Sequence, residues 1–419
     1  PCCASRPKAR KFQDWKCMSS KSDKKKSLVP RLRFPEFREA GAWEVKRLGE
    51  VCIICNGSSN AQDHVDDGAY PLFDRSEEIK RSSRYLFDAE AVIIPGEGMR
   101  FIPKYYCGKF DLHQRAYALS DFREVGKFIY YQLGALKGVL ASKAVMSTVL
   151  SLRMPILETF KLVIPSSGEQ QKIAHCLSSL DEVIGLQAKK VQALKQHKKG
   201  LMQQLFPAEG ETTPRLRFPE FREAGAWEVQ TIDQLVSKIA QGGTPKTSIP
   251  KYWNGDIPWI TPAEMGEDAA HHYAETTLRT ISREGFENSS TELLPVNSVI
   301  ISSRAPIGYV TINKVEMATN QGCKGFVPKK NTYHEFFYFS LIVAKQRLND
   351  LGAGAGFKEI STSTLKAFQI SIPKHLEQQK IAHCLSSLDE VIGLESHKLD
   401  ALKNLKKGLM QQLFPQDVP

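Results

Sequence analysis

Two segments of this 419-residue chain occur twice without a single change. PRLRFPEFREAGAWEV occupies residues 30–45 and 214–229, and EQQKIAHCLSSLDEVIGL occupies residues 169–186 and 377–394. The inserts between these frames, residues 46–166 and 230–374, share little sequence with each other. An internal repeat constrains the fold before any other feature, because each copy must fold as a similar unit. We therefore expect two related domains, each followed by the same kind of helix.

The second frame predicts a long helix in each copy, over residues 167–207 and 375–415. Each helix begins near a proline and ends at LFP, and about 38 residues at 1.5 Å each give a rod of roughly 57 Å. Apolar residues recur at alternating spacings of four and three, which is typical of a coiled coil. The predicted seam is Ile173, Leu177, Leu180, Ile184, Gln187, Val191, Leu194, Lys198, Leu201 and Leu205, and in the second copy Ile381, Leu385, Leu388, Ile392, Glu395, Leu399, Leu402, Lys406, Leu409 and Leu413.

The polar seam positions suggest that the two helices pair antiparallel. Setting Gln187 opposite Lys406 also sets Lys198 opposite Glu395 and keeps the leucines together, so one register pairs every polar position. The alternative is two amphipathic helices that each pack on their own domain. With antiparallel helices the two inserts would lie at opposite ends of the rod, as in a symmetric dimer.

Both inserts predict mixed α+β domains, over residues 30–166 and 208–374. The runs AVIIPGEG, NSVIISSRAPIG, FKLVIP and FQISIP are strand-like, and residues 125–140 and 334–351 are helix-like. A faint correspondence aligns AVIIPG…GKFDLHQRAYAL with SVIISS…VEMATNQGCKGF. The inserts are therefore expected to share a fold while their surfaces differ.

The net charge of +11 is concentrated in residues 1–29, which hold nine Lys or Arg against two Asp. This tail and residues 416–419 are expected to lie outside the folded domains, and Met18 offers a natural translation start. The rest of the chain carries only 48 basic against 44 acidic residues. Any surface for a polyanionic partner must therefore be local.

The nine cysteines are an odd count, which argues against a disulfide framework and favours the reducing cytoplasm. Cys52 and Cys55 form a single C-x-x-C, but a structural zinc needs four ligands. VCIIC is also typical of a buried strand, so we favour a core role over the metal or redox alternative. No run of eighteen apolar residues predicts a membrane span.

Several motifs together resemble the specificity subunit of type I restriction-modification systems. They are RLRFPEF…WE before each insert, YPLFDRSEE…GKFDLHQRAYAL in the first, YWNGDIPWIT and ISSRAPIG…ATNQGCKGF in the second, and EQQKIAHCLSSLDEVI…KKGLMQQLF in both helices. The resemblance covers the chain from about residue 28. It implies two target-recognition domains, each reading one half of a bipartite double-stranded DNA site.

The resemblance also implies that the helices set the gap between the half-sites and dock two methyltransferase subunits, to which restriction subunits are added. S-adenosylmethionine would be bound by the methyltransferase subunits, and no cofactor or metal is expected on this chain. Half-sites read from one face of B-DNA lie about 34 Å apart, which a rod of this length can span.

Catalytic motifs of methyltransferases and nucleotide-binding loops are not found in the sequence. GGTPKT and GAGAGF lack the required spacing and are more typical of a turn and a loop. His175 and His383 lie in the helical frame among apolar neighbours, which favours packing or partner contacts. The chain is therefore expected to be a non-catalytic subunit.

Base readout calls for Arg, Lys, Asn or Gln in loops beside strands, with hydroxyl and basic groups on phosphates. The candidates in the first insert are Arg75, Ser76, Lys80, Arg81, Arg84, Lys104, Tyr105, Tyr106, Lys109, His113, Gln114 and Arg115. Those in the second are Thr244, Lys246, Lys251, Tyr252, Trp253, Ser303, Arg304, Asn320, Gln321 and Lys324. Any one of them is alternatively a solvated side chain, and Trp253 and Trp259 are alternatively core anchors.

Two other classes of function stay open. One is a coiled-coil scaffold that joins two protein-binding domains, which would lack salt-dependent DNA binding. The other is a self-contained enzyme whose active site has no recognisable motif. The DNA sequence recognised does not follow from the residues, because there is no one-residue-to-one-base code.

Overall fold

A computed structural model describes residues 28–146, 149–266, 272–304, 306–352 and 359–415. The chain divides into unit 1, which comprises Pro1–Gly185 and Ala401–Pro419, and unit 2, which comprises Leu186–Asp400. The predicted tails, and residues 353–357 of the GAGAGF segment, lie outside the described residues apart from Leu28 and Val29. Each unit therefore contains one insert and a part of each long helix.

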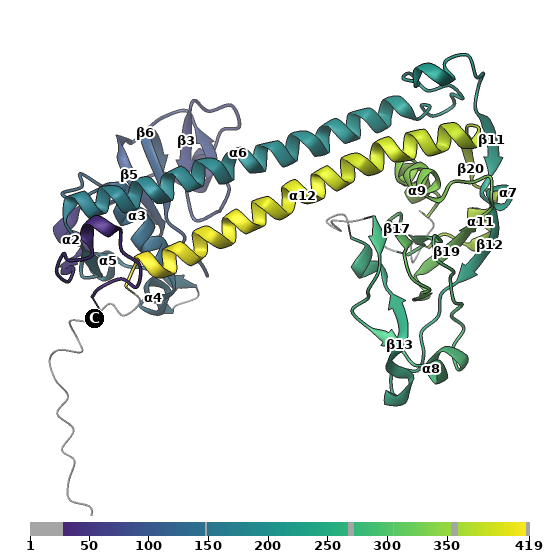
Figure 1. The fold of residues 1–419 in the computed structure, drawn as a ribbon. Coiled ribbons are helices and arrows are strands. Elements are labelled where there is room, and N and C mark those ends of the chain that lie inside the picture. The colour runs from purple at the N-terminus through teal and green to yellow at the C-terminus, as the bar shows by residue number, and fades with distance from the viewer. Residues whose placement is uncertain (1–27, 147–148, 267–271, 305, 353–358, 416–419) are drawn as a thin grey trace, which may run out of the picture. The chain divides into compact units, whose positions relative to one another are not determined.

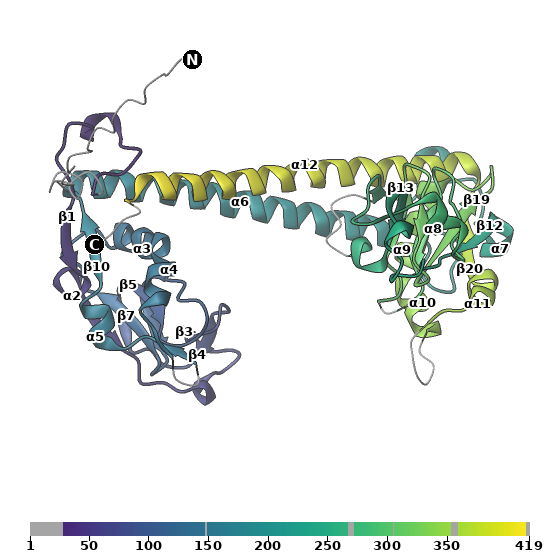
Figure 2. The same cartoon turned by 90° about the horizontal axis from the view of Figure 1, so that it is seen from below.

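Unit 1 is built on a six-stranded sheet with the order β2-β7-β5-β6-β3-β4, against which α3 packs. β1 and β10 form a separate antiparallel pair where the chain enters α6 (Figure 2). The strands are β1 (Glu44–Arg47), β2 (Ile53–Asn56), β3 (Tyr70–Phe73), β4 (Lys80–Ser82), β5 (Phe87–Pro95), β6 (Lys104–Leu112), β7 (Ala116–Ser120), β8 (Val145–Met146), β9 (Leu150–Ser151) and β10 (Lys161–Ile164). The helices are α2 (Leu48–Val51), α3 (Gly126–Ala135), α4 (Lys137–Ser142), α5 (Met154–Glu158) and the start of α6 (Ser167–Leu205).

Unit 2 has a five-stranded sheet, β12-β19-β16-β17-β14, and a three-stranded sheet, β15-β13-β18. β11 and β20 pair beside the start of α12 (Figure 1). The strands are β11 (Glu228–Thr231), β12 (Val236–Gln241), β13 (Trp253–Ile260), β14 (Tyr273–Ala274), β15 (Thr280–Ile281), β16 (Val299–Ser302), β17 (Val310–Asn313), β18 (Ala318–Thr319), β19 (Cys323–Pro328) and β20 (Gln369–Ile372). The helices are α7 (Ile232–Leu235), α8 (Arg283–Glu287), α9 (His334–Val343), α10 (Lys345–Leu351), α11 (Thr362–Ala367) and α12 (His375–Leu413).

These elements confirm the α+β class predicted for both inserts. The apolar runs at 91–95 and 299–302 form the fully buried second half of β5 and the whole of β16. Each predicted insert helix is divided in two, because the chain leaves helical geometry at Leu136 and Ala344. Cys52 lies in the core of unit 1, where burial raises the pKa of its thiol to about 12.

The repeated frame makes the same contacts in both units. Arg33 forms two hydrogen bonds with the Glu169 carboxylate, at 2.7 and 2.6 Å, and Arg217 forms two with Glu377, at 2.6 and 2.7 Å. Both glutamates lie in the first turn of a long helix, where a carboxylate also favours the positive end of the helix dipole. The identical segments thus fasten the chain that precedes each insert to the helix that follows it.

A second repeated contact joins each helix to its insert. The Gln170 amide oxygen accepts from the backbone of Val125, which precedes α3, and the Gln378 oxygen accepts from Tyr333, which precedes α9. The amide nitrogens donate to the carbonyls of Pro165 and Pro373, both at 2.9 Å. One glutamine therefore orients one insert helix in each unit.

The two long helices pair antiparallel within each unit, as the heptads predict. All twenty predicted seam residues are buried or half-buried, including Leu180, Ile184, Leu201, Leu388, Ile392 and Leu409. In unit 1 the start of α6 packs with the end of α12, and in unit 2 the end of α6 packs with the start of α12. Each helix is continuous over 39 residues.

The predicted register is wrong. Lys198 forms an ion pair with Asp389 instead of Glu395, and Lys406 pairs with Asp181. Gln187 donates to the Glu395 carboxylate at 2.6 Å. The prediction matched polar seam positions with one another, whereas the long lysine side chains reach aspartates that flank the seam.

The two lysine–aspartate pairs are equivalent contacts of the repeat. The ammonium of Lys198 lies over the Phe339 ring at 5.0 Å, and that of Lys406 lies over the Tyr131 ring at 5.3 Å. All four charged side chains keep 16–36% exposure, which lowers the cost of removing them from water. The polar seam residues thus fix alignment without a fully buried charge.

Candidate nucleic-acid interface

The loops at one edge of the unit 1 sheet enclose a polar cavity of about 430 Å³. The cavity lies at the ends of the parallel strands β3 and β6, where Phe73 pairs with Leu112. Beyond Leu112 the chain turns into β7. Five candidates from the sequence line it: Arg75, Lys80, His113, Gln114 and Arg115. Segments as far apart in sequence as Asn60 and Arg115 therefore converge on one corner of the unit.

Acidic side chains hold the cations of this cavity. Lys80 pairs with Asp74 at 2.7 Å, while Arg115 and Arg75 both approach Glu97. Burial alone would raise the pKa of Asp74, but hydrogen bonds from Lys80 and Ser76 lower it below its ordinary value. These ion pairs position arginine and lysine side chains that remain partly exposed.

The cavity is also built from residues that the sequence reasoning missed. Asn60 and Gln62 come from the loop after β2, and Asp74 and Glu97 carry its negative charge. The loop sequence GSSNAQD could have indicated the first two, since polar, turn-rich residues follow a strand there. Asp74 and Glu97 do not follow from a pattern for DNA contacts, because such a pattern favours cationic and amide side chains.

The remaining candidates of unit 1 already have partners within the protein. Arg81 donates to the carbonyls of Gly68 and Ala69, and Arg84 donates to Ser59 at 2.9 Å. Ser76 closes a turn on Asp74, and the Lys104 ammonium donates to the Ser76 carbonyl. Tyr105 bonds Glu90, Tyr106 packs on Phe73, and Lys109 lies over the Tyr85 ring at 4.6 Å. Only Lys109 of these last three is exposed.

Unit 2 has a corresponding group of polar loop residues, and we call this group and the lining of the unit 1 cavity the polar corners of the two units. Thr244 donates to the Gln321 oxygen, and the Asn320 amide donates to Thr244 and Gln321 at 3.1 and 3.0 Å. Arg304 pairs with Glu359 at 3.0 Å, with its side chain 48% exposed. Thr244, Arg304, Asn320 and Gln321 thus remain candidates for DNA contacts.

Four predicted contacts in unit 2 have side chains that are buried in the protein. Tyr252 and Trp253 are 8% and 9% exposed, Ser303 is 1% exposed and Lys324 is 7% exposed. Trp253 and Trp259 pack edge to face at 5.1 Å, which confirms the core alternative for these tryptophans. Lys246 and Lys251 are exposed, although Lys251 is paired with Glu284.

The two corners occupy equivalent places in the two units. Val92 pairs with Leu119 in unit 1, and Val299 pairs with Phe326 in unit 2. The backbone of His113 donates to the carbonyl at the end of β3, and that of Asn320 donates to the carbonyl at the end of β13. The faint correspondence seen in the sequence is therefore a true structural equivalence.

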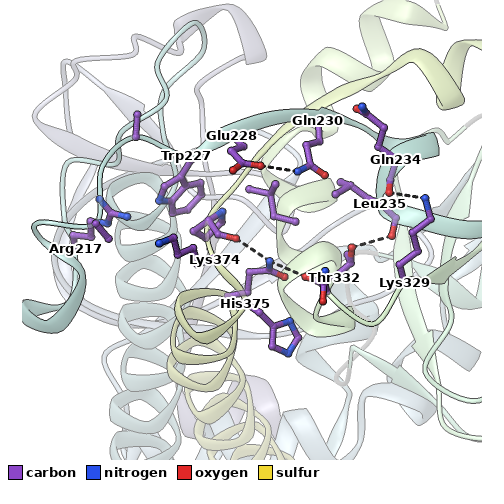
Figure 3. Close-up of a pocket in the computed structure, with 16 residues that line it drawn as sticks. Arg217, Trp227, Glu228, Gln230, Gln234, Leu235, Lys329, Thr332, Lys374 and His375 are labelled. Carbon is purple, nitrogen blue, oxygen red and sulfur yellow. Dashed lines mark hydrogen bonds between the residues drawn. The ribbon is translucent and has the colours of Figure 1, made fainter.

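The frame of unit 2 has a separate cavity of about 470 Å³ (Figure 3). Among its lining residues, the Gln230 amide donates a hydrogen bond to the Glu228 carboxylate, and the Lys329 ammonium donates one to the backbone carbonyl of Gln234. Some of its lining residues, including Arg217 and Trp227, come from segments that are identical in both units, and the others come from the insert and from the first residues of α12. No predicted DNA contact lines this cavity.

The residues that the structure describes contain neither a metal-binding cluster nor a membrane-spanning helix. Within the described ranges, no group of three or more His, Cys, Asp or Glu side chains is arranged to hold a metal ion. Across the same residues, no helix is long and apolar enough to cross a membrane.

The fold and the two corners define a repeat protein in which one constant scaffold presents two variable sets of polar loops. The family model described as "Type I restriction modification DNA specificity domain" matches residues 41–196 and 225–404. The chain therefore belongs to this family. The two matched segments are the two copies of the repeat.

Curated relatives carry corresponding names. The MjaIX specificity subunit of Methanocaldococcus jannaschii is 35% identical over 190 residues, which cover 45% of this chain and 44% of that protein. The MjaVIII specificity subunit of the same organism is 25% identical over 420 residues, which cover 91% and 93%. The EcoR124I/EcoR124II specificity subunit of Escherichia coli is 31% identical over 181 residues, which cover 40% and 42%. The chain thus spans less than half of the first and third relatives and most of the second.

Two solved structures share the fold. The S subunit of a type I restriction-modification system from M. genitalium superposes with a TM-score of 0.65 at 15% identity, covering 93% of this chain and 100% of that one. A chain from a structure titled for complex assembly and conformational transition of the type I R-M system gives 0.54, also at 15% identity. At this identity the likeness establishes the fold alone.

Proposed function

We propose that this chain is the DNA-reading subunit of a type I restriction-modification complex, and that each unit reads one half of a split, asymmetric site. The observation that carries the proposal is the contrast in sequence between the repeated frames and the polar corners of the inserts. The frames are identical in sequence, while the polar corners at equivalent places differ. A scaffold of this kind suits a target with two unlike halves.

The chemistry of the corners supports direct readout of bases. Arginine, glutamine and asparagine pair with base edges in the major groove, whereas lysine and hydroxyl groups serve phosphates. Arg115 and Gln114 in unit 1, and Asn320 and Gln321 in unit 2, supply such groups on loops held by a rigid sheet. Acids that hold Arg115 and Lys80 also limit nonspecific attraction to DNA.

The long helices are proposed to set the gap between half-sites and to dock two methyltransferase subunits in the cytoplasm. Val183 and Leu186 of α6, and Val391 and Leu394 of α12, are exposed by 41–70% and lie in the duplicated segment. Such a repeated apolar face suits two copies of one partner. Restriction subunits would join through that assembly.

Catalysis is assigned to the partners. The chain would hold no cofactor, and S-adenosylmethionine would be bound by the methyltransferase subunits. Comparing DNA methylation by the chain alone with methylation by the chain plus a methyltransferase subunit tests this assignment. Modification by the chain alone would contradict it.

Methylome sequencing of cells that express this chain with its partner subunits tests the main proposal. The expected result is one methylated motif with two unlike halves separated by unread bases. Lengthening α6 and α12 by equal whole turns should change the number of unread bases. An unbroken motif, or an unchanged gap in the lengthened variant, refutes the proposal. A protein scaffold would show no DNA binding that weakens with salt.

A further inference from the structure

Gln114 and Gln321 occupy the same position in the two units. Leu112 pairs with Phe73 at the end of β6, and Thr319 pairs with Ile260 at the end of β18. Seven residues after these strand ends, Leu119 of β7 pairs with Val92 of β5, and Phe326 of β19 pairs with Val299 of β16. Each glutamine is the second residue after its strand end, so the two are structurally equivalent.

This glutamine is the one identity in an otherwise divergent stretch. Residues 111–119 read DLHQRAYAL and residues 318–326 read ATNQGCKGF. Both glutamines are exposed, while the residue before each, His113 or Asn320, is half-buried. Packing therefore gives no reason for the shared side chain.

A close backbone contact fixes the turn that carries each glutamine. A Cβ on Gly57 would lie 1.9 Å from the Leu112 carbonyl oxygen, and a Cβ on Gly242 would lie 1.8 Å from the Asn320 oxygen. Glycine is required at both places because a larger residue would push the loop away. The loop that follows each glycine brings a polar side chain to the glutamine.

Those polar side chains brace the two amides. The Gln114 nitrogen donates to the Asn60 oxygen at 2.7 Å. In unit 2 the Gln321 oxygen accepts from Thr244, and from Asn320 at 3.0 Å. An exposed glutamine held in one orientation loses less conformational entropy when it binds a ligand.

We propose that Gln114 and Gln321 are equivalent specificity-determining residues, and that each reads one base pair of its own half-site. This inference rests on the proposed function. It goes further because it names one side chain and one base pair for each unit.

The braces decide which base edge each amide faces. Gln114 keeps its oxygen and one N–H free of other described residues, which matches the N7 acceptor and N6 donor of adenine. Gln321 has its oxygen occupied and presents N–H groups, which match the groove acceptors of a purine. Gln114 is therefore expected to read an adenine in one half-site. Gln321 is expected to read a purine in the other half-site, by donating to the hydrogen-bond acceptors of that base.

The test uses the complete methyltransferase complex with the full chain, carrying Gln114→Ala or Gln321→Ala. Methylation rates are measured on duplexes that vary one base pair of the wild-type site at a time. Loss of one bidentate contact is worth about 1–3 kcal/mol, or roughly 5–150-fold in discrimination. Gln114→Ala should lose that discrimination at one A·T pair of one half-site only. Gln321→Ala should lose it at one purine position of the other half-site.

Three further variants sharpen the test. Asn60→Ala and Thr244→Ala release the braces and should relax the same two positions less strongly. Gln369→Ala replaces an exposed glutamine on β20, the strand that pairs with β11, and should change nothing. The salt dependence of binding should stay unchanged in the glutamine variants, since bases and not phosphates are contacted.

The inference is overturned if either variant keeps full discrimination, weakens binding equally on all duplexes, or acts in the same half-site as the other. A G·C pair relaxed by Gln114→Ala overturns the adenine assignment. These outcomes differ from failure of the proposed function, in which the unaltered complex would modify no split motif. A split motif that survives both variants refutes the inference alone.

Discussion

Replacing Arg217 tests whether the repeated frame holds unit 2 together. Its guanidinium makes two hydrogen bonds to Glu377 and a third to the Gly225 carbonyl. The two side chains of the ion pair are only 9% and 1% exposed, and hydrogen bonding to Glu377 raises the pKa of Arg217. Arg217→Met would leave the Glu377 carboxylate buried without its partner.

Breaking one side of a buried ion pair costs about 3–5 kcal/mol. The dipole of α12 favours the remaining carboxylate, so the lower end of this range is expected. For a unit of roughly 200 residues, each kcal/mol lowers the midpoint of thermal unfolding by about 2–4 °C. Arg217→Met should therefore lower the unfolding midpoint of unit 2 by about 6–12 °C.

Urea unfolding of the full chain measures the free energy directly. Arg283→Met is a matched control, because the Arg283–Glu287 pair is 74% and 58% exposed and should contribute at most about 0.5 kcal/mol. The double variant Arg217→Met/Glu377→Gln should regain part of the loss, since no charge is then left unpaired. A loss below about 1 kcal/mol for Arg217→Met would refute the argument that this contact fastens the frame.

Three other predictions concern the seam, pH and DNA binding. Lys198→Met should destabilise the helix pair of unit 2 by about 1–2 kcal/mol in urea unfolding, because Asp389 loses a partner whose side chain is only 16% exposed; an unchanged midpoint would contradict the observed register. Burial alone would lower the pKa of His272, but the nearby carboxylates of Asp389 and Glu335, at 3.5 and 3.8 Å, raise it above its ordinary value. Its contribution to stability should be complete below pH 6.5 and disappear as pH rises through the raised pKa, and His272→Phe should abolish this dependence in thermal unfolding at several pH values. Arg115→Ala should reduce discrimination between the true site and altered sites by about 5–150-fold in competition binding, and full discrimination at physiological salt would remove Arg115 from the interface.

Periodicity and repetition determined most of the architecture. The heptads predicted the ends of α6 and α12 to within two residues and located all twenty seam positions. Apolar runs located the buried parts of β5 and β16. These patterns are local, since a helix or strand must bury one face wherever it packs.

Tertiary structure decided the register of the helices and the membership of the polar corners. Lys198 meets Asp389 because a long side chain can leave the seam, a choice that heptad spacing does not encode. Tyr252, Trp253, Ser303 and Lys324 look like binding residues in sequence, yet packing buries them. Asn60 and Gln114 are far apart in the chain and meet only because Gly57 lets two loops touch. Which polar side chains share a surface depends on such long-range contacts, and no local pattern records them.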